Sequence, residues 1–177
     1  MAKTGYILKD SVIGQALVAD LPPMSMGELS VAENAVATVI TTQSAYTRCD
    51  EADTLTTGAT DFDKPQAGRL RYTGAATKMF HVGCTFSCSN GNNIIVKSVI
   101  YKNGTVNVNN EYTGGTAMTA GTVEQKISVA GDIVSTAIHV FIELAQNDYI
   151  EMAIANLTDT GDITTKHMNL FAMEMYG

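Results

Sequence analysis

The stretch that decides the fold is KMFHVGCTFSCS, residues 78–89. Apolar and polar residues alternate along it, which is the pattern of a β-strand with one buried face. Successive side chains of a strand point to opposite faces. One face should therefore be buried and the other should not. The expected buried face carries Phe80, Val82, Cys84, Phe86 and Cys88, and the opposite face carries His81, Gly83, Thr85 and Ser87.

Turns and further strands follow this stretch. Asn and Gly residues at 89–93 predict a turn, because both tolerate positive φ. A strand is expected over 94–101, and Lys102-Asn103-Gly104-Thr105 predicts a hairpin turn whose return strand is 105–108. The later predictions are a flexible stretch at 112–116, strands at 123–129, 138–144, 149–157 and 163–176, and turns at 146–148 and 158–162.

The residues before the deciding stretch are less uniform. Residues 35–42 are rich in β-branched side chains and predict a strand, and 69–73 alternate as a half-buried strand does. Between them, 51–68 contain Gly, Asp and Pro residues and predict a long loop. Residues 1–30 contain an apolar segment without a clean period and a Pro-Pro break. They predict an extended N-terminal arm, or alternatively an N-terminal strand with a poorly ordered leader.

Many short strands and no amphipathic helix of 10–12 residues predict an all-β sandwich or barrel. No repeat or linker divides the body of the chain. We therefore expect the N-terminal arm at 1–30 and one β-domain at 31–177, in a chain of 177 residues.

Composition excludes several kinds of partner. The chain carries 11 basic and 18 acidic residues and has no basic cluster, so we expect no nucleic-acid binding. No apolar run approaches the length of a membrane span, and no secretory signal is visible, so we expect no membrane partner and synthesis in the cytoplasm. Cys49, Cys84 and Cys88 form no disulfide framework and are expected to be free thiols.

Catalytic motifs are missing from the sequence. His81, His139 and His167 lack metal-ligand spacing, and no nucleophile elbow occurs. We therefore expect no enzyme activity, no cofactor and no metal site. Two alternatives stay open at this point: a pair of carboxylates that meets only in space, and a surface cation at the acidic turns 61–63 or 159–162.

The last predicted strand is apolar on both faces. Met168, Leu170 and Ala172 lie on one face, and Phe171, Met173 and Met175 on the other. A strand of a sandwich usually buries one face and exposes the other. One face is expected to pack in the sandwich and the second against another subunit of a cyclic oligomer, or else under a loop of the same chain.

Three short motifs occur in a recognisable order: GRLRYTG at 68–74, IYKNG at 100–104 and LAQNDYIEM at 144–152. In this order they resemble the trimeric jelly rolls of the complement and tumour-necrosis-factor type that are found in phage structural proteins. Asn147 stands where that family commonly has Gly, and Asn also tolerates positive φ. The resemblance covers residues 60–177 and implies a jelly-roll β-sandwich that forms a homotrimer. The expected trimer interface comprises Tyr149, Met168, Leu170, Phe171, Met173 and Met175.

The same resemblance implies a function. It points to a bacteriophage capsid decoration (cement) protein that binds the major capsid protein on the surface of the virion. The alternative is the receptor-binding knob of a phage tail or fibre. The N-terminal arm is expected to grip the capsid through Tyr6, Ile7, Leu8, Val12, Ile13 and Leu17.

Overall fold

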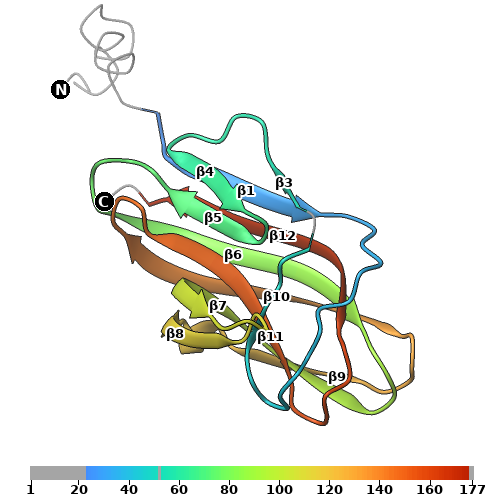
Figure 1. Cartoon of the computed structure of the whole chain (residues 1–177). Helices are drawn as coiled ribbons and strands as arrows, with labels where there is room; N and C mark the ends of the chain where they lie inside the picture. Colours follow the sequence, from blue (N-terminus) through green and yellow to red (C-terminus); the bar gives the residue numbers. More distant parts are fainter. Residues whose placement is uncertain (1–22, 52, 176–177) are drawn as a thin grey trace, which may run out of the picture.

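The computed structural model describes residues 23–51 and 53–175, which fold into a β-sandwich of two facing sheets (Figure 1). The elements are β1 (Met26–Val31), β2 (Thr47–Arg48), β3 (Thr54–Leu55), β4 (Phe62–Gln66), β5 (Arg69–Tyr72), β6 (Lys78–Ser89), β7 (Ile94–Val106), β8 (Tyr112–Ala117), the 3-10 turn η1 (Thr119–Gly121), β9 (Val123–Ile127), β10 (Ile133–Leu144), β11 (Tyr149–Asn156) and β12 (Thr164–Glu174).

The topology is that of a jelly roll. The first sheet has the order β10-β6-β12-β1-β3, and the second has the order β4-β5-β11-β7-β8, with β2 beside β11 and β9 beside β7. From β5 onwards the chain crosses between the sheets, so that β6, β10 and β12 lie in the first sheet while β7 and β11 lie in the second. The fold class expected from the sequence, an all-β jelly-roll sandwich, is confirmed.

The core lies between the two sheets. The predicted inner face of β6 is fully confirmed, since Phe80, Val82, Cys84, Phe86 and Cys88 are all buried. Three aromatic rings pack together within the core: Phe62, Tyr72 and Phe80 have ring centroids 5.0 to 5.3 Å apart. Cys49, Cys84 and Cys88 are free thiols, as expected.

The sandwich begins earlier than residue 31. Strand β1 pairs antiparallel with β12 from Met26 opposite Met173 to Val31 opposite Met168, so residues 26–30 belong to the sheet. Just before it, Ser25 is anchored by polar contacts: its backbone N–H donates to Glu174 at 2.8 Å, and Lys78 Nζ donates to its Oγ at 2.9 Å. The part of the expected arm that precedes residue 23 lies outside the described residues.

Two predictions upstream of β5 are wrong. Residues 35–42 form no strand: Thr38 makes an isolated bridge with Ile163, while Val36 and Val39 are exposed. β-branched composition alone does not supply a neighbouring strand, and strand preference depends on such packing. The expected loop 51–68 holds the short strands β3 and β4, which pair with β1 and β5 respectively.

The predicted hairpin is displaced along the chain. Strand β7 runs through the expected turn at 102–105, and Asn103 uses its positive φ of 53° at an irregularity inside the strand. The turn falls at 107–111, and the stretch expected to be flexible is the return strand β8. At the 146–148 turn, by contrast, Asn147 has the expected positive φ, 71°.

A buried acid near β2 makes stability depend on pH. Glu51 is 6% exposed; its Oε1 accepts from Thr38 Oγ1 at 2.7 Å, while its Oε2 has no partner among the described residues. Desolvation raises the pKa of Glu51. Ionisation is therefore harder in the folded chain than in the unfolded chain, and the group costs native stability as the pH rises through the raised pKa.

We expect Glu51→Gln to gain stability relative to wild type at pH 8, and to gain less at pH 4, where the carboxyl is largely protonated. Urea unfolding of both proteins at the two pH values measures this. Glu143→Gln, at an exposed site on β10 with no ion pair, is the matched control. An equal Glu51→Gln difference at pH 4 and pH 8 would contradict the prediction.

Candidate functional site

The outward face of the first sheet can be read from its strand register. His139 lies opposite Gly83 and Phe141 opposite His81 on β10 and β6, and Phe171 lies opposite Gly83 on β12 and β6. Residues that lie opposite each other share a face. The outward positions of these three strands are Met79, His81, Gly83, Thr85, Ser87, Ser89, Ile133, Ser135, Ala137, His139, Phe141, Glu143, Thr164, His167, Asn169, Phe171 and Met173. Glu143 is the one carboxylate at these positions, none of which is Lys or Arg; Lys166 lies at the bulge of β12, and Glu28 of the adjoining strand β1 lies opposite Phe171.

One half of this outward face is apolar. We call the set Met26, Met79, Phe141, Phe171 and Met173 the apolar patch. Phe141 is 66% exposed, Met79 45% and Met173 39%. Soluble monomers rarely leave large apolar side chains contiguous and exposed, and such patches mark interaction surfaces.

Two histidines occupy the centre of the patch. His81 Nε2 lies 3.1 Å from His139 Nδ1, and the two rings are nearly parallel, with an interplanar angle of 20°. The ring of Phe171 lies edge-on to His81, with centroids 5.6 Å apart. Gly83 makes room for this arrangement: a Cβ there would lie 2.6 Å from the Phe171 ring and 3.0 Å from His139 Nδ1.

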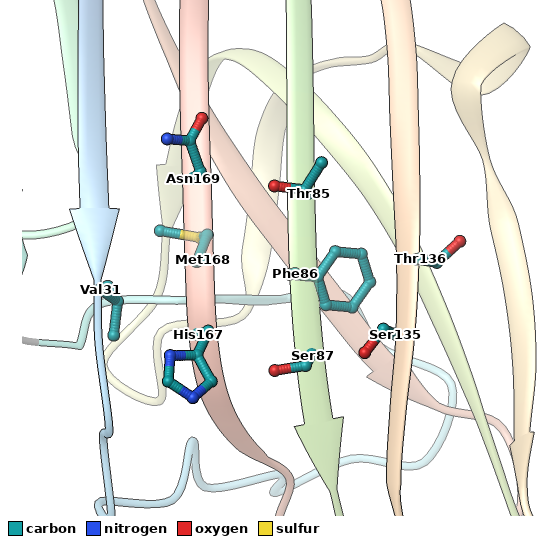
Figure 2. Close-up of a pocket in the computed structure, with 9 residues that line it drawn as sticks. All are labelled: Val31, Thr85, Phe86, Ser87, Ser135, Thr136, His167, Met168 and Asn169. Carbon is teal, nitrogen blue, oxygen red and sulfur yellow. The ribbon is translucent and has the colours of Figure 1, made fainter.

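The other half of the face is a shallow depression. Its volume is about 590 Å³, and Figure 2 shows its lining on four neighbouring strands: Val31, Thr85, Phe86, Ser87, Ser135, Thr136, His167, Met168 and Asn169. The side chains that face outward here are small or polar, and Asn169 donates to Glu28 from the next strand. The surface therefore changes from large apolar side chains at one end to a hollow bordered by smaller side chains at the other.

Two grooves border the apolar patch. A groove of about 270 Å³ separates β1 and β12 from the loop 56–59 and is lined by Met26, Phe171 and Met173. On the opposite side, a groove of about 380 Å³ lies between η1 and β10, where His139 and Phe141 form one wall. These grooves give the patch concave margins that a partner surface can fill.

The residues predicted for the trimer interface on β12 and just after it differ in their exposure. Phe171, Met173 and Met175 are at least partly exposed, and the first two belong to the apolar patch. Met168 and Leu170 are buried in the core, because their side chains point between the sheets. Neither side chain can contact a second subunit, so Met168 and Leu170 do not belong to the interface that the sequence predicted.

Tyr149 is not brought together with the C-terminal residues. It lies on β11 in the second sheet, where its hydroxyl donates to the carbonyl of Gly104 at 2.9 Å and Arg69 stacks 3.7 Å from its ring centroid. The capsid-arm residues Tyr6, Ile7, Leu8, Val12, Ile13 and Leu17 all lie outside the described residues.

The second sheet holds a buried ionic network. Glu151 is fully buried, accepts from Arg69 Nε at 2.9 Å and from Tyr112 Oη at 3.2 Å, and lies 3.7 Å from Arg48. Burial raises the pKa of Glu151 despite the two neighbouring guanidinium groups. The network ties β11 to β5, to β2 and to the β7–β8 hairpin, which is a structural role.

Reactive groups are scarce in the described part of the chain. Burial raises the pKa of Cys88 to about 11 and also raises the pKa of Cys49 and Cys84, so the three thiols are protonated at neutral pH. Among residues 23–51 and 53–175, no three His, Cys, Asp or Glu side chains of one chain gather as metal ligands. Within the same ranges, no helix is long and apolar enough to cross a membrane.

Comparison with known proteins bears on the fold. No family model and no curated protein matches the chain. Among solved structures, Eiger TNF from S. frugiperda superposes with a TM-score of 0.55 at 10% identity, over 88% of this chain and 94% of that chain. Murine APRIL, solved at pH 5.0, superposes with a TM-score of 0.49 at 12% identity, over 86% of this chain and all of that chain. The first match shows that the chain has a TNF-like jelly-roll fold.

Proposed function

We propose that this chain forms a homotrimer through the apolar patch and acts as a capsid decoration (cement) protein, bound to the major capsid protein on the surface of a bacteriophage virion. The apolar patch is the observation that carries the proposal. A fold with this patch needs a partner to cover it, and the chain offers no comparable group of reactive side chains within the described residues.

A second copy of the chain suits the patch for an electrostatic reason. The protein has a net charge of −7, so two copies that meet through a charged surface would repel each other. The outward positions of β6, β10 and β12 include one carboxylate, Glu143, and β1 adds a second, Glu28, which lies opposite Phe171 and accepts a hydrogen bond from Asn169. Copies that meet through the patch therefore bring few like charges together, and aromatic and Met side chains are typical of the centre of an interface.

The capsid part of the proposal is supported by the order of the motifs at 68–74, 100–104 and 144–152, which resembles phage jelly rolls. The fold agrees with that resemblance without identifying the partner. A cement protein stabilises a capsid by burying surface. Each trimer buries apolar surface across the joint between capsid subunits, and this burial contributes a free energy of about 25 cal/mol per Å² before the costs of association.

Cosedimentation tests the capsid role. We expect the wild-type chain to pellet with particles assembled in its absence, and to raise the temperature at which these particles release their contents. Replacing Tyr6, Ile7, Leu8, Val12, Ile13 and Leu17 together by Ser should reduce the pelleted fraction at least about tenfold, since it removes six apolar side chains.

The matched control for the arm variant is Val108→Ser with Val129→Ser, which removes exposed apolar side chains from two turns of the sandwich. This control should pellet like wild type. Equal pelleting of the arm variant and wild type would remove the arm from the proposal, and no pelleting of the wild type would overturn the capsid role itself.

A further inference from the structure

The two histidines of the apolar patch lie at hydrogen-bonding distance from each other, and the same separation suits two ligands of one metal ion. His81 Nε2 and His139 Nδ1 are 3.1 Å apart. Imidazole nitrogens bind Zn²⁺ at about 2.0–2.1 Å, so two of them on one ion lie about 2.9 Å apart at a right angle and about 3.4 Å apart at the tetrahedral angle. The observed separation falls between these two values.

The backbone holds both ligands in place before any ion arrives. β6 and β10 pair without interruption from Lys78 opposite Leu144 to Ser89 opposite Ile133, so the two positions are fixed by the ladder on either side. Gly83 leaves the space into which the His139 ring and Phe171 fit. A site whose ligands are already positioned loses little conformational entropy on binding.

The surroundings of the pair are mostly apolar. Phe141 and Phe171 lie against the His81 ring, with centroids 5.5 and 5.6 Å away. No described carboxylate, Lys or Arg makes a hydrogen bond or ion pair with His81 or His139. Neutral imidazole is the form that binds a metal, and it suits Zn²⁺, Ni²⁺ and Cu²⁺ better than Mg²⁺ or Ca²⁺.

We propose that His81 and His139 together bind a divalent transition-metal ion such as Zn²⁺ or Ni²⁺. His81 Nε2 and His139 Nδ1 are the protein ligands, and water or groups of a neighbouring copy fill the remaining positions. Both protein ligands come from one chain, so the site does not rest on the proposed trimer. If copies meet through the apolar patch, the ion lies at their contact and links metal supply to assembly.

Equilibrium dialysis of the full chain, purified without a histidine tag, against Ni²⁺ or Zn²⁺ at pH 7.5 tests the site. We expect saturable binding by wild type, with binding weakened at least about tenfold in His81→Ala and in His139→Ala, because even the loss of groups that only support a ligand costs 10–100-fold.

His167→Ala is the matched control. His167 is an exposed histidine of the same sheet face, and its Nδ1 accepts a weak hydrogen bond from the backbone of Glu33 at 3.4 Å. This variant should bind metal like wild type. Unfolding midpoints of the three variants without metal check that each is folded, and His81→Asn replaces His81→Ala if that variant is unstable.

Two results would overturn the proposal: no saturable binding by wild type up to about 1 mM metal, or equal binding by wild type and the double variant His81→Ala/His139→Ala. Light scattering on the same samples reports the oligomeric mass separately. Failure of the metal site is therefore distinguishable from failure of the trimer.

Discussion

The double variant Phe141→Glu/Met173→Glu is expected to be a monomer under conditions where the wild type forms the proposed trimer of about three times 18.8 kDa. Both side chains belong to the apolar patch and are exposed on the single chain, so the change should leave the sandwich folded. Aromatic residues at the centre of an interface commonly contribute about 2 kcal/mol or more each, and about 1.4 kcal/mol is a tenfold change in affinity. A buried unpaired carboxylate adds a further cost.

Light scattering or native mass spectrometry at micromolar concentration measures the change. Val108→Glu is the matched control, since Val108 is a fully exposed apolar residue in the β7–β8 turn, away from the patch. The control should keep the mass of wild type. A double variant that remains trimeric would show that copies meet elsewhere, and a monomeric wild type would remove the trimer from the proposed function.

The largest effect on folding is expected at Glu151. Its carboxylate is the common acceptor for Arg69 and Tyr112 and lies beside Arg48, with a side chain that has no solvent exposure. Glu151→Ala leaves the guanidinium of Arg69 partly buried beside an empty space. Removing one partner of a buried ion pair typically costs about 3–5 kcal/mol, because the remaining charge stays unpaired.

Urea unfolding at pH 7 measures the loss as a lower midpoint for Glu151→Ala. Glu151→Gln is the second variant, since it keeps the shape of the side chain and one acceptor oxygen and removes the charge. Its urea midpoint should lie between those of wild type and Glu151→Ala. Glu143→Ala, at an exposed position of β10, should be close to wild type. Equal stability of Glu151→Ala and wild type would show that the network contributes nothing to folding.

The alternation of apolar and polar residues in the sequence predicted a strand correctly where that strand buries one face and not the other. Residues 78–89 match β6 at both ends, since every second side chain enters the core. Residues 35–42 had the right composition and no alternation, and they do not pair as a strand. At 102–105, Asn103 has the backbone conformation that the turn prediction required, but it serves an irregularity within β7.

The candidate site was predictable only in part. The two apolar faces of the last strand were visible in the sequence, and Phe171 and Met173 do lie outward. The pairing of His81 with His139 was not visible, because 58 residues separate them and only the register of β6 with β10 brings them together. A histidine on the outward side of each of two long alternating strands was the available signal, and it requires knowing which strands are neighbours.

The central position of β12 has a consequence for the order of folding. Strand β12 lies between β6 and β1, so the first sheet is divided into β10-β6 and β1-β3 until β12 is added. It is the last strand of the sandwich to leave the ribosome. Strand β1 has no β12 partner until synthesis of the sandwich ends, since Met26 pairs with Met173, which is 173 − 26 = 147 positions later. Such distant pairings slow folding to the millisecond-to-second range, and the strand edges that β12 will cover stay unpaired during that time.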